Sequence, residues 1–296
     1  MQISSGSALV LRLFLSALAM SLMALAYSRA DSAPTMASTA NNFLASLYPE
    51  QREKAAFRVD DDERFNWFYT PVPRKGLPLR EMTSGQRQLA LALLSAGLSP
   101  RGYIKGMTIM SVDEILMVLE ASGPRRDPDG YFFSIFGQPS ETGVWGYRID
   151  GHHLSQSFTV VNGKVAGAPS FFGVNPAEVQ KGPRKGLRTL AREEDLGREL
   201  VQSLTDAQRN TAIVDASAPR DILTEHSRQA ALTGQASGIS VSALSPQQRE
   251  KLRDLLDEYC ENMAEDLAAF RKDQIKKAGN DLWFAWEGGI QKGEPH

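Results

Sequence analysis

Residues 131–166 read YFFSIFGQPSETGVWGYRIDGHHLSQSFTVVNGKVA, and this stretch decides the fold. Short runs in which apolar and polar residues alternate are separated by turn residues, a pattern typical of β-strands rather than helices. Asn162-Gly163 is a dipeptide typical of a tight hairpin turn. We expect four strands, at Tyr131–Phe136, Val144–Ile149, Leu154–Val161 and Lys164–Ala166. The stretch therefore predicts an antiparallel sheet.

Helical patterns lie on both sides of this stretch. Apolar residues at helical spacing predict a first helix over about residues 41–57, and further helices within residues 187–204 and 245–279. An aromatic segment at residues 281–287 has the composition of a final strand. The order of these elements indicates an α+β fold, in which helices flank a central antiparallel sheet built from residues 130–166 and 281–287.

A short motif recurs at four helix starts and ends each time in Gln-Arg. In three of the four copies a Thr or Ser stands three residues before the Gln, so the two side chains can form a capping box at the start of the helix. The four pairs are Gln51-Arg52, Gln86-Arg87, Gln208-Arg209 and Gln248-Arg249. Their spacing is irregular, so we interpret the motif as helix punctuation and not as a solenoid repeat or a functional site.

Residues 1–30 have the pattern of a secretory signal peptide. They contain two arginines and no acidic residue, an apolar run over Leu13–Ala26, and small residues that allow cleavage after Ala26 or Ala30. The run is short for a transmembrane helix, so we expect a secreted or periplasmic protein with no stable membrane span after cleavage. An uncleaved membrane anchor is the alternative.

The composition of the remaining chain limits its partners and its organisation. The full sequence has a formal net charge of -2, which supplies no general attraction to nucleic acid, and we expect no nucleic-acid partner. The single cysteine, Cys260, excludes an intrachain disulfide and a zinc site with several cysteines. Small polar residues predict a flexible leader over residues 31–40, and residues 41–296 are expected to form a single α+β domain.

Two adjacent histidines, His152 and His153, are the strongest candidates for chemistry. Imidazole is a common metal ligand and carries protons near neutral pH. Because neighbouring side chains of a strand point to opposite faces, only one of the pair is expected to enter any one pocket, unless a bulge at Gly151 relaxes the alternation. A zinc site needs three or four ligands, and the chain has only two other histidines, His226 and His296.

The leading hypothesis is a metal-dependent enzyme that holds a divalent metal ion. His152 or His153 would bind the metal or move a proton, and His296 would be a further metal ligand. Arg148 is a candidate catalytic residue that would hold an anionic group of a small-molecule substrate. The aromatic candidates for binding the substrate are Trp145 and Tyr147. The alternative is a non-catalytic binding or structural protein in which the histidine pair is a hydrogen-bonded element of the core.

Several segments resemble one family of secreted proteins, which share the domain of unknown function 3500. The segments that carry the resemblance are Arg126-Asp127-Pro128, Ile135-Phe136-Gly137-Gln138-Pro139, Trp145-Gly146-Tyr147-Arg148, Gly151-His152-His153-Leu154-Ser155, Pro169–Ala177 and Phe284-Ala285-Trp286-Glu287-Gly288. The resemblance covers nearly all of the mature chain and implies a shared fold, without an activity.

The resemblance also implies a difference at the C-terminus. Similar proteins continue past Pro295-His296 with a strand-rich ending that carries a His-x-His element and an Asp-rich tail. By this comparison the chain would lack a terminal hairpin that pairs with Leu282–Trp286, and that segment would remain an unpaired edge. It would also lack the histidines best placed to complete a site with His152 or His153.

Overall fold

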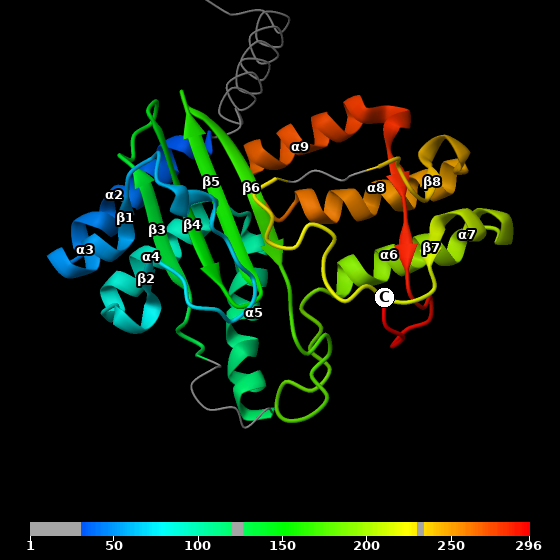
Figure 1. Ribbon diagram of the computed structural model, residues 1–296, viewed down its shortest axis with the longest axis horizontal. Helices are drawn as coiled ribbons and strands as arrows, with labels where there is room; N and C mark the ends of the chain where they lie inside the picture. Colours follow the sequence, from blue (N-terminus) through cyan, green and yellow to red (C-terminus); the bar gives the residue numbers. More distant parts are fainter. Residues whose placement is uncertain (1–30, 120–126, 230–233) are drawn as a thin grey trace, which may run out of the picture. The chain divides into compact units, whose positions relative to one another are not determined.

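In the computed structural model, the four predicted strands form an antiparallel meander (Figure 1). They are β3 (Phe132–Gly137), β4 (Val144–Gly151), β5 (Leu154–Val161) and β6 (Lys164–Phe172). Asn162 and Gly163 join β5 to β6 with φ angles of 51° and 77°, the left-handed conformation that a two-residue hairpin turn requires. The strands and the turn predicted from the sequence are confirmed.

Two short strands extend this sheet beyond β3. β1 (Ala56–Phe57) pairs with β3 in parallel, and β2 (Leu77–Pro78) pairs with it in antiparallel orientation. The result is a mixed, mainly antiparallel sheet of six strands. Its β1 and β2 come from a part of the chain that precedes the meander, so the loop between them lies beside the sheet.

Eight α-helices accompany the sheet in the residues that the structure describes, which are 31–119, 127–229 and 234–296. They are α2 (Ser32–Ser46), α3 (Pro49–Ala55), α4 (Ser84–Ala96), α5 (Pro100–Leu119), α6 (Ala191–Ser203), α7 (Asp206–Ala212), α8 (Pro246–Cys260) and α9 (Glu265–Ala278). The α+β class is therefore confirmed. The expected signal peptide over residues 1–30 lies outside the described residues.

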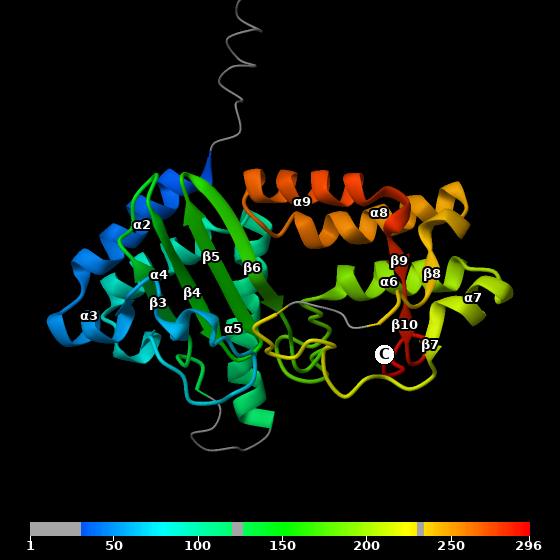
Figure 2. The ribbon, with the colours of Figure 1, turned by 45° about the horizontal axis from the view of Figure 1, so that its top comes forward.

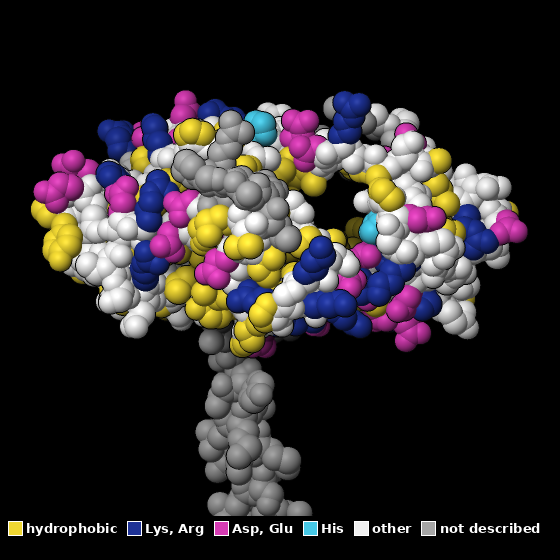
Figure 3. Space-filling model, turned by 90° about the horizontal axis from the view of Figure 1, so that it is seen from below, with side chains coloured by type: hydrophobic (Ala, Val, Ile, Leu, Met, Phe, Trp, Pro, Cys, Tyr) yellow, Lys and Arg dark blue, Asp and Glu magenta, His cyan; other side chains and the backbone are white. Residues whose placement is uncertain are grey.

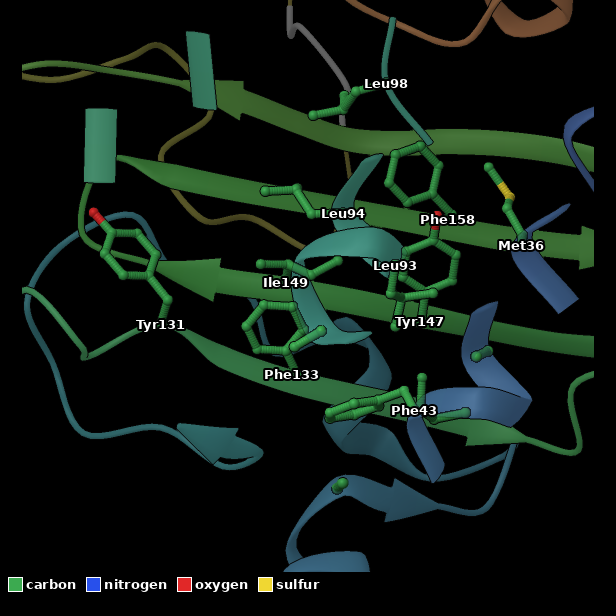
Figure 4. Close-up of a cluster of buried hydrophobic side chains, with 14 of the residues drawn as sticks. Met36, Phe43, Leu93, Leu94, Leu98, Tyr131, Phe133, Tyr147, Ile149 and Phe158 are labelled. Atoms are coloured by element: carbon green, nitrogen blue, oxygen red, sulfur yellow. The ribbon is translucent and has the colours of Figure 1, made fainter. Parts of the chain in front are cut away.

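One face of the sheet is apolar and packs against helices. Tyr147, Ile149 and Phe158 point from β4 and β5 into this core, where Leu93 and Leu94 of α4 meet them (Figure 4). All five side chains are 1% exposed or less. Burial of a side chain of this size contributes about 1.5–3 kcal/mol, so this core is the main source of stability for the sheet.

The flexible leader expected over residues 31–40 is wrong. These residues belong to α2, in which Met36 and Ala40 are fully buried. The backbone N–H and the hydroxyl of Ser32 donate to Asp266 Oδ2 at 2.9 and 2.8 Å, which ties the start of α2 to α9. The small residues that suggested flexibility instead allow α2 to approach its neighbours closely.

The segment at residues 281–287 does not join the central sheet, and that part of the prediction is wrong. Two strands of this segment pair in separate two-stranded sheets. They are β9 (Trp283–Phe284), antiparallel to β8 (Ile239–Ser240), and β10 (Trp286–Glu287), parallel to β7 (Ile213–Asp215). Phe284 packs in a second core with side chains of α6 and α8, and this core determines where the segment lies.

The recurrent Gln-Arg motif forms two reciprocal glutamine pairs. The capping boxes predicted before Gln86, Gln208 and Gln248 are confirmed. Gln51 and Gln86 exchange side-chain hydrogen bonds of 3.1 and 2.8 Å, and Gln208 and Gln248 exchange bonds of 3.0 and 2.9 Å. Each pair therefore joins the starts of two helices that are distant in the chain.

The elements around one glutamine pair are repeated around the other. Figure 2 shows α2, α3 and α4 on the side of β3, and α6, α7 and α8 on the side of β9 and β10. The first half runs α2, α3, β1, β2, α4, and the second runs α6, α7, β7, β8, α8. The strand pairings match as well, because Phe133 of β3 lies opposite Leu77 and Phe284 of β9 lies opposite Ile239. Gly137 is the last residue of β3 and Gly288 directly follows β10, and their φ angles are 83° and 87°. The structure thus contains an internal repeat.

Candidate active site

His152 and His153 form the two-residue turn between β4 and β5. Gly151 and Leu154 pair on either side of them, and His153 has a φ of 60°. The His153 N–H donates to the carbonyl oxygen of Tyr69 at 2.8 Å, and the His153 carbonyl accepts from the N–H of Gly173 at 2.7 Å. The two imidazole rings stack with centroids 3.8 Å apart. Because the pair lies in a turn, the strand alternation used in the prediction does not separate it.

A buried carboxylate on α5 orients His152. His152 Nδ1 lies 2.7 Å from Asp113 Oδ1, and the Tyr131 hydroxyl donates to Asp113 Oδ2 at 2.6 Å. The same hydroxyl lies 2.9 Å from the carbonyl oxygen of His152. The side chain of His152 is 11% exposed and that of Asp113 is 5% exposed. Three segments of the chain therefore meet at one carboxylate.

The hydrogen bonds indicate which member of the group donates and which accepts. A carboxylate only accepts hydrogen bonds, so Nδ1 of His152 is the donor in its contact with Asp113. Burial, together with the adjacent Asp113 charge, raises the pKa of Tyr131 well above its usual value, and Tyr131 stays a donor. A histidine oriented by a carboxylate in this way can act as a general acid or base.

His152 lines a cavity of about 320 Å³ at this end of the sheet, which we call the His152 cavity. Its other lining residues are Pro71, Val72, Pro73, Arg74, Arg80, Asp113, Asp127, Gly130 and Phe132. Arg80 is about half exposed, donates to Asp127 at 2.7 Å and lies 5.4 Å from the centroid of the Phe132 ring. The cavity thus combines an oriented imidazole with a guanidinium suited to a carboxylate or phosphate group.

Arg148 lies on the opposite face of β4 from the apolar core and is held by carboxylates. It donates to the Glu63 side chain at 2.7 Å, and its Nε lies 3.3 Å from Asp150 Oδ2. Asp150 also pairs with Arg74. Burial raises the pKa of Asp150 to about 6 against the opposing effect of the two arginines, and burial lowers the pKa of Arg74. Arg148 borders a second cavity and does not line the His152 cavity.

Trp145 and Tyr147 lie in the hydrophobic core, on the other face of β4 from Arg148. Tyr147 stacks between Trp145 and Phe158, with centroids 5.9 and 4.9 Å away. Burial raises the pKa of Tyr147 well above its usual value. Neither aromatic residue lines the His152 cavity, although Tyr147 borders the cavity beside Arg148.

The structure does not bring His296 to the histidine pair. The His296 ring stacks on Trp286 with centroids 5.1 Å apart, and His296 lines a third cavity of about 670 Å³ together with Tyr259 and Glu194. The space-filling view shows a deep hollow between the half that carries the large sheet and the half that carries β9 and β10 (Figure 3). Across residues 31–119, 127–229 and 234–296, no group of three or more His, Cys, Asp or Glu side chains is placed to hold a metal ion.

The most informative site residues were not singled out in the sequence. Asp113 lies inside α5 and Tyr131 directly precedes β3, so no local motif joins them to His152. The sequence did single out His152, in the aromatic-rich stretch, as a candidate. Only the packing of α5 against the β4–β5 turn brings the acid and the imidazole together.

Comparison with known proteins gives a family and no activity. A family model described as "Protein of unknown function (DUF3500)" matches residues 29–296. No curated protein and no solved structure matches the chain. Among the described residues, none of the helices has both the length and the apolar character needed to cross a membrane.

Proposed function

Because the chain belongs to the DUF3500 family, whose function is unknown, we propose an activity from its own side chains. We propose that it is an enzyme that performs general acid–base catalysis on a small anionic substrate in the His152 cavity. The observation that carries this proposal is the 2.7 Å contact between Asp113 and His152 at the wall of that cavity. His152 would move the proton, Asp113 would orient the ring, and Arg80 would bind the anionic group of the substrate.

Two further features support the assignment of roles. The Tyr131 hydroxyl and Asp113 are buried, so the acid cannot turn away from His152 without losing hydrogen bonds. Arg80 is partly exposed, and its present partner, Asp127, is also partly exposed. An exposed ion pair is weak, so a substrate anion can compete for Arg80 at little cost.

A panel of small carboxylate and phosphate compounds, esters among them, tests this proposal. Purified protein is incubated with the panel, and consumption of each compound is followed by mass spectrometry. We expect at least one compound to be consumed, and His152→Gln to slow its turnover by about 10² or more. Asp113→Asn should also slow turnover, because it no longer holds the Nδ1 proton in place.

The matched control is His226→Gln. His226 stacks on Phe68, with ring centroids 4.8 Å apart, and does not line the His152 cavity. It should turn over the substrate at the rate of the parent protein. An equal loss of turnover in His226→Gln and His152→Gln, or full activity of His152→Gln, would contradict the proposed role of His152.

A second candidate function is binding without catalysis. The observation that favours it is that the backbone of His153 is anchored on both sides, to Tyr69 and Gly173, as in a structural turn. In that case the panel would yield compounds that bind and raise the melting temperature but are not consumed. His152→Gln would then weaken binding of these compounds, and neither the variant nor the parent protein would consume them.

We propose in addition that the protein is exported from the cytoplasm. The support is the sequence pattern of residues 1–30, with its basic start, apolar run and small residues before Asp31. N-terminal sequencing of the protein recovered from the medium or periplasm tests the proposal. A mature N-terminus near Asp31 or Tyr27 is expected, whereas an intact Met1 in the cytoplasmic fraction would contradict export.

A further inference from the structure

A cavity of about 420 Å³ lies on the polar face of the central sheet and shares no lining residue with the His152 cavity. We call it the sheet cavity. Its floor is formed by β4 and β5, where Arg148 lies opposite Ser157 and Thr159 follows on the same face. Its roof is formed by residues 58–76, which join β1 to β2, and by residues 216–229, which follow β7.

The two roof loops hold each other in place. The Trp67 indole N–H donates to the carbonyl oxygen of Ser227 at 3.3 Å, and the Tyr69 hydroxyl donates to Asp221 at 2.5 Å. Tyr69 and Trp67 are both less than 9% exposed. The roof is therefore preformed, and a ligand would not have to order it.

Aromatic rings make up much of the wall of the sheet cavity. Phe65, Trp67, Phe136 and Phe171 all line it. The Trp67 and Phe171 rings contact each other, with centroids 6.4 Å apart and planes inclined by 47°. Aromatic walls of this kind favour a flat apolar group, which gains contact area on their faces.

Arg64 gives the cavity a positive charge. It donates to the Thr159 hydroxyl at 2.9 Å and lies 5.5 Å from the Phe65 ring centroid. Among the residues that the structure describes, Arg64 forms no ion pair, whereas Arg148 is matched by Glu63. A partly buried guanidinium binds a carboxylate through two parallel hydrogen bonds, so the charge of the cavity favours an anion.

A buried hydroxyl in the floor also calls for a polar partner. Ser157 Oγ is buried and has no hydrogen-bond partner within the described part of the chain. A buried polar group without a partner costs about 1–3 kcal/mol, and a ligand oxygen at this point would remove that cost. Ser157 lies next to Arg148 across the strand pair, at the bottom of the cavity.

We propose that the sheet cavity is a binding site for an aromatic carboxylate. The ring lies between the aromatic walls, and the carboxylate accepts hydrogen bonds from Arg64, with Ser157 as a further donor. The site is separate from the His152 cavity, and its ligand is not the substrate that His152 acts on.

Calorimetric titration of the purified full chain with 2-naphthoate tests this proposal, with the neutral 2-naphthamide as the comparison ligand. We expect the parent protein to bind the carboxylate at least about tenfold more tightly than the amide. Arg64→Gln should abolish this preference. Phe65→Ala should weaken binding of both ligands alike, because it removes wall area and no charge.

Arg80→Gln is the matched control, since Arg80 lines the His152 cavity and not the sheet cavity. It should bind both ligands as the parent protein does. Equal affinity of the parent for carboxylate and amide would overturn the proposal, as would a preference that survives in Arg64→Gln. A preference lost in Arg80→Gln would place the ligand in the other cavity and overturn it too.

Discussion

Glu63 and Arg148 are 85 residues apart in the chain and form a buried ion pair of 2.7 Å beneath the sheet cavity. The Arg148 guanidinium also donates to the backbone carbonyl of Glu63 at 2.6 Å. This double contact fixes the loop between β1 and β2 to the centre of β4. It explains how a long, irregular loop can carry both the aromatic wall of the sheet cavity and the contacts to His153.

Removal of one charge of this pair should destabilise the fold. Glu63→Gln leaves the buried Arg148 charge without its closest carboxylate, so we expect the free energy of unfolding to fall by about 3 kcal/mol. Urea denaturation measures the change. Asp60→Asn is the control, because Asp60 pairs with Arg58 on an exposed surface, and its unfolding curve should match that of the parent. Similar losses in the two variants would contradict this account.

Asp150 should stabilise the folded protein more strongly as the pH falls from 7 toward 4.5. Its pKa is raised from 3.8 to about 6 in the folded protein, mainly by burial. Between these values the folded state binds a proton that the unfolded state does not, so the Asp150 contribution to the free energy of unfolding rises as the pH falls. From pH 7 to about 4.5 this rise amounts to about 2 kcal/mol.

The pH effect is isolated by comparison with Asp150→Asn, which cannot titrate at this position. Urea unfolding of both proteins is measured at several pH values between 7 and 4.5. The free energy of unfolding of the parent minus that of the variant should increase as the pH falls. A difference between the two that stays constant, or that shrinks toward low pH, would disprove the raised pKa.

The Tyr131 hydroxyl should support catalysis without taking part in it. Tyr131→Phe removes one of the two donors to Asp113, and we expect turnover to fall by about tenfold and the free energy of unfolding by about 1 kcal/mol. Tyr147→Phe is a matched control in the same core, because the Tyr147 hydroxyl is buried and bonds to no described residue. That variant should be as stable as the parent or more so. Steady-state kinetics on the identified substrate and urea unfolding provide both readouts.

The two glutamine pairs should stabilise the fold independently of each other. Gln51→Ala and Gln86→Ala remove the same reciprocal bonds, so their effects on the free energy of unfolding should be non-additive by about 1 kcal/mol. Gln86→Ala and Gln248→Ala lie in different pairs and should add. Double-mutant cycles by denaturant unfolding measure both coupling energies. Strong coupling between Gln86 and Gln248 would contradict the independence of the two glutamine pairs.

The parts of the fold that depend on local patterns could be predicted from the sequence. The β3–β6 meander follows from alternation and a turn signal such as Asn162-Gly163, and three capping boxes follow from fixed spacings. The position of residues 281–287 could not be predicted, because strand composition does not say which sheet a strand joins. The same limit applied to α2, where small side chains are compatible with both a mobile leader and a closely packed helix.

The candidate site was predictable only in its centre. The rarity of histidine in the chain and the adjacency of His152 and His153 made this pair a candidate, but the sequence placed it on or beside a strand and not in a turn. Asp113 could not be linked to them, because it is 39 residues from His152 and reaches it through a helix packed on the sheet. Arg148 was predicted to hold an anionic group of a substrate. In the structure its guanidinium contacts the carboxylates of Asp150, two residues away, and Glu63, whose distance of 85 residues in the chain hid the pair from the sequence.

The two roof loops of the sheet cavity come from the two copies of the internal repeat. The loop from β1 to β2 and the loop that follows β7 occupy corresponding places in the two halves, and they meet at the contact between Trp67 and Ser227. The sheet cavity therefore lies where the two repeats meet, and each repeat supplies one loop of its roof. Because the two loops differ in sequence, one repeat contributes Arg64, Phe65 and Trp67 to the pocket and the other contributes Ile222, Thr224, Ser227 and Arg228.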